Sequence, residues 1–206
     1  GEYAALAAAG SISIADGARL LRLRGDAMQN AVAVGEGAMA AILGADEALI
    51  TKIVTEAGDV GVVQLANDNA PGQIVISGSA GAVDRAMEIS RDKGLRKVIK
   101  LPVSAPFHCD LMAPAAEAMA AALSSVSFAD AALPVICNVT AAGEQKADAL
   151  KANLITQITG RVRWRESLMA LDAAGAGVFV EIGTGKVLSG LVKRTLSDKT
   201  IVNLDS

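Results

Sequence analysis

The sequence predicts an α/β protein with a parallel-sheet core and an inserted ferredoxin-like subdomain of the order βαββαβ. Its 206 residues are 52% hydrophobic and 20% charged, so the chain can bury a sizeable core. Predicted strands and helices alternate on both sides of a central stretch, residues 36–103, which begins where Gly35 and Gly37 break the preceding helical pattern. We therefore expect a core made of residues 1–35 and 104–206, and a subdomain made of 36–103.

Two helices are predicted before the insertion. The first covers Tyr3–Ala9 and ends at Gly10. Asp16 is expected to cap the second, which runs to about Asn30. The chain opens with Gly1 rather than Met, already inside an Ala-rich helical pattern, which favours a fragment or a processed piece of something longer.

Six elements are predicted within the insertion. Helical spacing of apolar residues marks two helices, and short apolar runs mark four strands. In order they are Ala38–Leu43 (strand), Asp46–Ala57 (helix), Val60–Leu65 (strand), Gln73–Ser77 (strand), Ala80–Lys93 (helix) and Lys97–Leu101 (strand). The polar stretch Asn67–Gly72 predicts the turn of a hairpin.

Strands and helices alternate again after the insertion. The last predicted strand is almost wholly apolar, which is typical of a strand buried on both faces of a parallel sheet. The predicted elements are Leu111–Ser124 (helix), Val135–Val139 (strand), Ala147–Thr159 (helix), Trp164–Ala173 (helix), Gly177–Ile182 (strand) and Lys186–Leu196 (helix).

The composition excludes several functions. The net charge of −3 leaves no basic surplus for a phosphate backbone, so nucleic acid is not expected as a partner. One His and two Cys, with no CxxC pair, argue against zinc, and no metal or cofactor is expected. No apolar run is long enough for a membrane span, so no membrane partner is expected. Two cysteines without a secretory segment favour a reducing, cytoplasmic location.

Arg24 is the first candidate binding residue. On its helix the residues three and four positions away are apolar, namely Leu20, Leu21, Ala27 and Met28. A guanidinium on an apolar stripe needs an anion, because an unpaired buried charge costs several kcal/mol. That anion is either a core carboxylate, which position alone favours, or a substrate carboxylate bound in bidentate fashion. Arg22 and Asp26 can pair on the exposed side.

His108 is the only imidazole of the chain. Pro102 and Pro106 stiffen its approach, and Asp110 is expected to cap the following helix, so the ring would lie beside a helix N-terminus. The positive end of a helix favours neutral imidazole, the form that a general base requires. A purely structural histidine is the alternative. Cys109 is adjacent, and adjacent residues rarely face each other as a catalytic pair.

The stretch Gly183-Thr184-Gly185-Lys186 does not match the phosphate-binding loop pattern. Val180 stands where that pattern requires Gly, and Val187 follows the lysine. A tight turn from strand to helix is the better interpretation.

Several motifs in order resemble the bacterial malonyl-CoA:acyl-carrier-protein transacylases of the acyltransferase family. They are Gly1-Glu2-Tyr3, Arg24-Gly25, Asn69-Ala70-Pro71-Gly72-Gln73, Pro106-Phe107-His108 and Glu181 to Leu188. The resemblance covers essentially the whole chain and implies a hydrolase-like acyltransferase core. In the family, Gly-His-Ser-Leu-Gly-Glu-Tyr carries the nucleophilic serine, which would lie two residues before Gly1. The oxyanion-hole amides also fall outside this sequence.

The resemblance implies roles for particular residues. Arg24 would bind the malonyl carboxylate, His108 would be the catalytic base, and the backbone carbonyl of Gln157 would orient it. Phe107 matches a position linked to selection of malonyl over bulkier units. Met28 and Asn69 are further expected substrate-binding residues. Thr184 stands where many relatives have Pro.

The implied reaction is transfer of malonyl from malonyl-CoA to the phosphopantetheine thiol of acyl carrier protein in fatty-acid biosynthesis, through an acyl-serine. A monomer is expected. The alternatives are an acyltransferase of the same fold serving polyketide synthesis, a non-catalytic acyl-CoA or carrier-protein binding module, and a decorated ferredoxin-like regulatory domain with purely structural Arg24 and His108.

Overall fold

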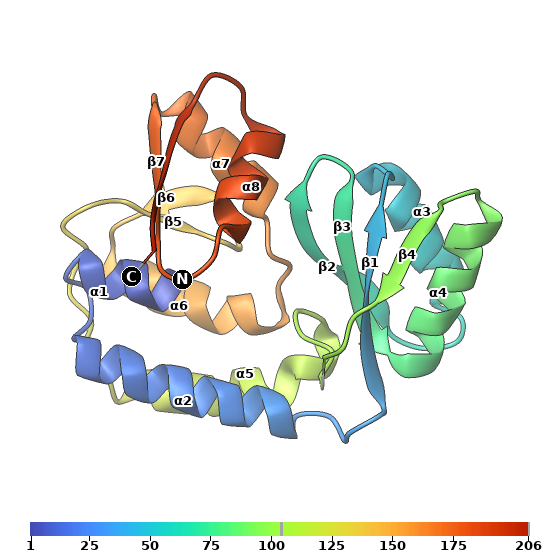
Figure 1. The fold of residues 1–206 in the computed structure, drawn as a ribbon. Coiled ribbons are helices and arrows are strands. Elements are labelled where there is room, and N and C mark those ends of the chain that lie inside the picture. Colours follow the sequence, from blue (N-terminus) through green and yellow to red (C-terminus); the bar gives the residue numbers. More distant parts are fainter. Residues whose placement is uncertain (104, 206) are drawn as a thin grey trace.

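The computed structural model describes residues 1–103 and 105–205 and has an α/β fold (Figure 1). Residue 104, where the sequence predicts that the core resumes after the subdomain, and the last residue, 206, lie outside the described residues. The helices are α1 (Glu2–Ala8), α2 (Ile14–Asn30), α3 (Glu47–Ala57), α4 (Ala80–Asp92), the 3-10 helix η1 (Asp110–Met112), α5 (Ala113–Ser124), α6 (Ala147–Thr159), α7 (Trp164–Ala173) and α8 (Val187–Thr195). The strands are β1 (Gly37–Leu43), β2 (Val63–Ala70), β3 (Gln73–Ser79), β4 (Lys97–Lys100), β5 (Val135–Cys137), β6 (Ala142–Glu144), β7 (Val178–Ile182) and β8 (Thr200–Leu204).

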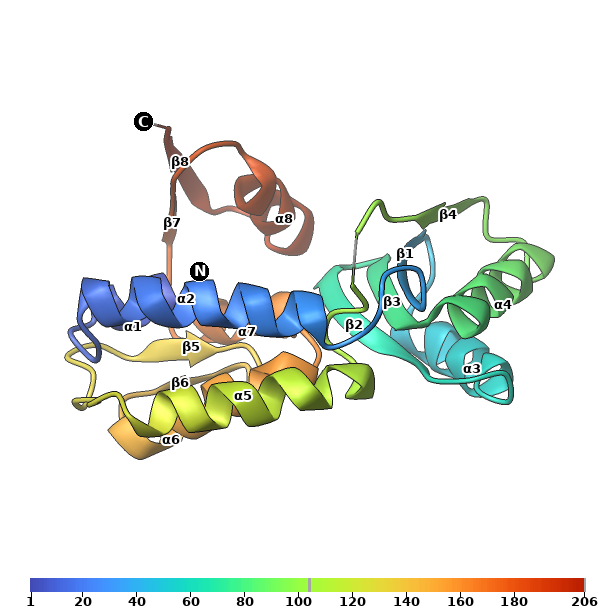
Figure 2. The same cartoon turned by 90° about the horizontal axis from the view of Figure 1, so that it is seen from below.

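One four-stranded antiparallel sheet is built wholly from the central stretch. Its strand order is β2-β3-β1-β4, and α3 and α4 pack together against it. The chain order β1-α3-β2-β3-α4-β4 agrees with the predicted βαββαβ. Figure 2 shows the two helices on the same side of this sheet. The apolar residues between helices and sheet form a core cluster drawn from residues 38–89.

A second core cluster joins the segments before and after this sheet. Its buried residues come from α1 and α2, from η1 and α5, and from β5 and α6. In both views α2 lies alongside α5 (Figures 1 and 2), and each contributes apolar residues to the cluster, such as Leu20 and Met119. Segments on both sides of the central stretch, up to Ile158, therefore share one core, which excludes the central stretch itself. None of the described helices is long and apolar enough to cross a membrane.

Two helix caps differ from the prediction. Ser13, not Asp16, caps α2: its hydroxyl accepts the N–H of Asp16 at 3.0 Å. Asp16 instead occupies the third helical position, where an acidic side chain completes a capping arrangement by accepting the Ser13 hydroxyl at 2.5 Å. Asp110 does not cap the helix that follows His108 either, because its carboxylate accepts a hydrogen bond from Gln64 at 2.8 Å.

The predicted turn at Asn67–Gly72 is wrong for most of its length, because β2 continues to Ala70 and only Pro71 and Gly72 turn the chain. The predicted strand also begins too early, at Val60 rather than Val63. The polar residues stay extended because Asp68 pairs with a distant arginine and its backbone pairs with Val162.

The C-terminal strands differ from the prediction in burial and in number. β7 pairs with β8 in parallel, but its Val178 and Ile182 side chains are 58% and 81% exposed. The expected burial on both faces is therefore wrong for the described residues, since β8 is the one strand that pairs with β7 and α8 packs on only one face of the pair. β6 and β8 were not predicted, because β6 has only three residues and β8 follows a short turn from α8.

Candidate active site

Gln157 brings the two predicted site residues together. It lies in the last turn of α6, where it is buried. Its side-chain oxygen accepts a hydrogen bond from Arg24 at 2.8 Å, and its backbone carbonyl lies 3.1 Å from Nδ1 of His108. Arg24, 133 positions away in the sequence, and His108, 49 positions away, thus both contact Gln157. Arg24 and His108 therefore lie close together in the fold.

Arg24 has one neutral partner and one vacant donor. The helix α2 carries its guanidinium inward, as the apolar neighbours predict, and the side chain is part-buried. No ion pair between Arg24 and a carboxylate is found among the described residues, and its buried Nε has no hydrogen-bond partner there. Burial lowers the pKa of Arg24, while Tyr3 and Glu2 act against that shift. The core salt bridge that position alone favoured is therefore not present.

His108 is held by two carbonyl groups. Its Nδ1 lies 3.1 Å from the carbonyl oxygens of both Gln157 and Gly160. Carbonyl oxygens only accept, so Nδ1 carries the proton in the neutral ring, and Nε2 keeps its lone pair. An imidazole with a free Nε2 lone pair can accept a proton from a hydroxyl or thiol.

The pKa of His108 is lowered, but for a different reason from the one predicted. Burial is the main cause, and the charge of Arg24 adds to it, while the two carbonyls oppose it. These carbonyls belong to the C-terminal end of α6, so the predicted influence of a helix N-terminus is not what favours the neutral ring. Burial in low dielectric does so instead.

The backbone of His108 is itself unusual. Its φ of 60° lies in the left-handed region, which costs a non-glycine residue on the order of 1 kcal/mol or more. The residue before it, Phe107, contacts both the main core and a small cluster on the sheet, and Pro106 packs against Gly37 at the start of β1. The thiol of Cys109 donates to the Pro106 carbonyl at 3.1 Å and does not pair with the imidazole. The surroundings therefore determine this conformation.

The remaining predicted substrate-binding residues are less closely joined to this pair. Met28 is a buried member of the main core cluster, one helical turn beyond Arg24. Asn69 is half-buried on β2. Phe107 directly precedes the base. Their contact with a substrate stays a prediction.

Sequence reasoning missed Gly160, whose carbonyl is the second acceptor for His108. A backbone carbonyl has no residue signature, so no motif could have revealed it. Sequence reasoning also missed Glu181, whose carboxylate accepts the N–H groups of Leu188 and Ser189 at 3.0 and 2.8 Å. It thereby caps α8 from the preceding strand, and Gly183 and Gly185, both with positive φ, form the tight turn that was predicted.

Comparison with known proteins places this geometry in context. The family model described as "Acyl transferase domain" matches residues 1–204. The malonyl CoA-acyl carrier protein transacylase of Bacillus subtilis (strain 168) is 52% identical over 198 residues, which are 94% of this chain and 62% of that protein. The protein of the same name from Escherichia coli (strain K12) is 44% identical over 200 residues, covering 97% and 65% of the two chains.

Solved structures agree with this similarity. The crystal structure of acyl-carrier-protein-S-malonyltransferase from Bartonella henselae has a TM-score of 0.97 and 48% identity, covering all of this chain and 66% of that one. A type II polyketide acyl-carrier protein in complex with its malonyl-transacylase also matches, with a TM-score of 0.97, 39% identity, and coverage of 100% and 67%. The chain thus spans slightly less than two thirds of the two curated relatives named above.

Proposed function

Since the chain belongs to the acyl transferase domain family, we propose that it carries the carboxylate-binding and proton-accepting part of a malonyl-CoA:acyl-carrier-protein transacylase. The observation that carries this proposal is the sharing of Gln157 by Arg24 and His108. Arg24, a cation with an unpartnered buried Nε, contacts the side chain of Gln157, and the imidazole of His108 contacts the backbone carbonyl of the same residue. Transfer of an acidic acyl group requires both.

In the proposed reaction a serine hydroxyl attacks the thioester carbonyl of malonyl-CoA. The resemblance expects this serine two residues before Gly1, outside the 206 residues. Nε2 of His108 accepts the hydroxyl proton, and the tetrahedral intermediate collapses with release of the coenzyme A thiol, which takes that proton. The phosphopantetheine thiol of acyl carrier protein then gives its proton to His108 and attacks the acyl-serine carbonyl. The second tetrahedral intermediate collapses with release of the serine oxygen, which takes that proton from His108 and regenerates the neutral imidazole.

Arg24 would provide selectivity for malonyl over acetyl. A malonyl carboxylate can accept hydrogen bonds from the terminal nitrogens of Arg24, whereas acetyl would leave a part-buried guanidinium without an anion. A site built around a polar partner rejects the analogue lacking it by roughly 10⁴-fold. Phe107, Met28 and Asn69 are proposed to line the acyl site.

The substitution Arg24→Ala tests the proposal in the full-length protein that contains this chain. With equal malonyl-CoA and acetyl-CoA, intact-mass spectrometry of the carrier protein should show loss of malonyl transfer and a relative gain of acetyl transfer. Arg22→Ala is the matched control, because Arg22 lies on the same helix with an 83% exposed side chain paired to Asp26. An unchanged malonyl preference in Arg24→Ala would contradict the proposal.

A second candidate is the same transfer serving polyketide synthesis, which the similarity to the type II polyketide malonyl-transacylase favours. Presenting fatty-acid and polyketide carriers to the full-length protein separates the two by relative rates. A non-catalytic binding module would instead bind malonyl-CoA without a covalent malonyl adduct in the protein's intact mass.

The finer architecture is part of the proposal. We assign residues 36–103 to a ferredoxin-like subdomain inserted into a hydrolase-like acyltransferase core formed by 1–35 and 104–206. The two separate core clusters and the strand order β2-β3-β1-β4 support this division. A monomeric, cytoplasmic protein is also proposed, and Cys109 and Cys137 are both free thiols.

A further inference from the structure

Strand β2 of the small sheet pairs with the segment that carries the second acceptor of His108. The N–H of Asp68 donates to the carbonyl of Val162 at 2.8 Å, and the N–H of Val162 donates to the carbonyl of Ala66 at 2.7 Å. Val162 lies two residues after Gly160, whose carbonyl accepts from the imidazole. The segment 160–165, here called the acceptor segment, is therefore docked on β2 by backbone hydrogen bonds.

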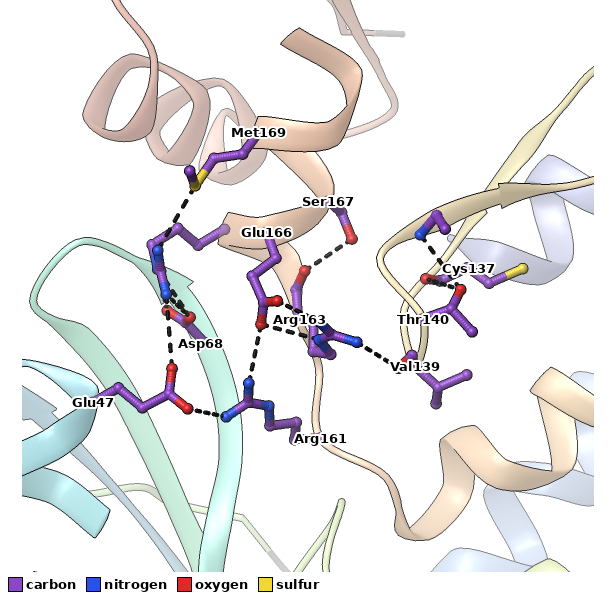
Figure 3. Close-up of polar contacts among 12 residues, drawn as sticks. Glu47, Asp68, Cys137, Val139, Thr140, Arg161, Arg163, Glu166, Ser167 and Met169 are labelled. Atoms are coloured by element: carbon purple, nitrogen blue, oxygen red, sulfur yellow. Dashed lines mark hydrogen bonds and ion pairs between the residues drawn. The ribbon is translucent and has the colours of Figure 1, made fainter. Parts of the chain in front are cut away.

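Side chains strengthen this docking (Figure 3). The Asp68 carboxylate, with its side chain only 2% exposed, accepts from Nε of Arg165 at 3.0 and 2.9 Å and from Nη2 at 2.7 Å. From α3, Glu47 accepts from Arg161 at 2.5 Å. A buried carboxylate is stable only when it is paired, so removing either partner leaves an uncompensated charge. The acceptor segment thus has an ionic contact near each of its ends, from Arg161 to α3 and from Arg165 to β2.

Glu166 and Val139 hold the other side of the acceptor segment. The carboxylate of Glu166 accepts from Arg161 at 3.0 Å and also pairs with Arg163, which in turn donates to the Val139 carbonyl at 3.1 Å. Figure 3 shows these side chains converging between α7 and the loop that carries Val139. The segment is thereby fixed relative to both parts of the molecule.

The same strand also holds the loop that carries the imidazole. Gln64 on β2 and Asp110 form a reciprocal pair: the N–H of Asp110 donates to Oε1 of Gln64 at 2.7 Å, and Nε2 of Gln64 donates to the Asp110 carboxylate at 2.8 Å. Asp110 lies two residues after His108, whose left-handed backbone needs support from its surroundings.

We propose that β2 aligns His108 with its acceptor, and that Gln64 and Asp68 are positioning residues for the imidazole. Gln64 fixes the loop that carries His108 through Asp110, and Asp68 fixes the acceptor segment, which begins at Gly160. Alternate residues of one strand, 64, 66 and 68, therefore set the distance between Nδ1 and the carbonyl. The catalytic consequence rests on the proposed function, whereas the alignment itself does not.

The single histidine makes the alignment directly measurable. In this chain labelled with ¹⁵N-histidine, the imidazole nitrogens should report one neutral tautomer, with the proton on Nδ1. Gln64→Met removes both hydrogen bonds to Asp110 at similar side-chain length, and Asp68→Asn removes the charge paired with Arg165. In each variant the Nε2–H tautomer of His108 should become populated. Exchange of the Nδ1 proton with water should be about fivefold faster, the ratio expected from the loss of one ordinary hydrogen bond.

Glu88→Gln is the control, because Glu88 forms an exposed ion pair with Arg85 on α4. It should leave both readouts unchanged. If Asp68→Asn fails to fold, Gln64→Met decides, because Gln64 is half-buried and uncharged. A wild-type tautomer and exchange rate in a folded Gln64→Met variant would overturn the inference.

Activity provides a separate arm in the full-length protein. Gln64→Met should lower kcat while leaving KM for malonyl-CoA unchanged, because it displaces the base and not Arg24. A changed tautomer with an unchanged kcat would overturn the link to catalysis, and the Arg24→Ala selectivity test independently reports whether the proposed function holds.

Discussion

Gly37→Ala should disturb the His108 loop from the opposite side, because Gly37 leaves no room for a side chain. A Cβ at this position would lie 2.3, 2.4 and 2.9 Å from three ring carbons of Pro106. Carbon atoms in contact normally stand at about 3.5–4.0 Å. A proline ring cannot rotate away, so either β1 or the loop that carries His108 must move.

The expected net cost is about 1–2 kcal/mol in the free energy of unfolding. Overpacking by one methyl costs roughly 1–3 kcal/mol. Replacing Gly by Ala also lowers the conformational entropy of the unfolded chain, which stabilises the folded protein by roughly 0.4–1 kcal/mol where the backbone is compatible. Gly37 does not have a positive φ, so this second contribution applies.

Urea unfolding and the resonance of the single imidazole measure the two consequences. The urea midpoint should fall, and the His108 signal should shift, because Pro106 lies two residues before it. Gly190→Ala is the matched control: this glycine is in α8, and a Cβ there meets nothing within 4 Å. That control should stabilise the protein by about 0.5–1 kcal/mol through helix propensity.

An unchanged midpoint together with an unchanged His108 signal in Gly37→Ala would refute the reasoning. It would mean that Pro106 does not pack on β1 as described. A destabilised variant with an unchanged His108 signal would refute only the connection between this contact and the imidazole.

Three further outcomes are expected. Because burial lowers the pKa of His108, its imidazole should titrate below 6.5, the ordinary value for the unfolded chain. Below pH 6.5 the unfolded chain then binds more protons than the folded protein, so the urea midpoint should fall as the pH drops. A titration midpoint of His108 at or above 6.5 would contradict this. Burial raises the pKa of Cys137 to about 11, so iodoacetamide at pH 8 should label it only in the unfolded protein, as mapped by peptide mass spectrometry. Glu181→Ala removes the acceptor for two N–H groups in the first turn of α8, so amide exchange there should accelerate, and unchanged protection would count against that cap.

The spacing of apolar residues and the positions of glycines were sufficient to predict those helices that neighbouring residues in the sequence determine. The helices 147–159 and 164–173 agree with the prediction to the residue, because apolar spacing and a following Gly160 or Gly175 define them. The helix predicted over Asp46–Ala57 is also observed, as α3 (Glu47–Ala57), with Asp46 as its N-cap accepting the N–H of Leu49 at 2.8 Å. The family resemblance, carried by motifs in order along the chain, is also confirmed.

Prediction failed where a distant partner overrides local preference. Asn67–Gly72 has the composition of a turn, yet Asp68 stays in a strand because Arg165, 97 residues away, neutralises it. For the site, Arg24 and His108 could be selected from an apolar stripe and a proline-flanked approach. Their convergence on Gln157 depends on the packing of α2 and α6 around one core, which no local pattern contains.

The contrast between Arg24 and the arginines of the acceptor segment supports the proposal that Arg24 binds an anionic ligand. Arg161, Arg163 and Arg165 each contact a carboxylate, and their charges are satisfied within the protein. Arg24 has comparable access to the interior but contacts a neutral amide instead, and Gln157 in turn holds His108. The fold pairs its other part-buried guanidinium groups with carboxylates but leaves that of Arg24 beside His108 without one. An unpaired, part-buried guanidinium lowers the stability of the folded protein. The proposed anionic substrate would offset that cost, because its carboxylate would pair with Arg24 close to His108, the proposed base.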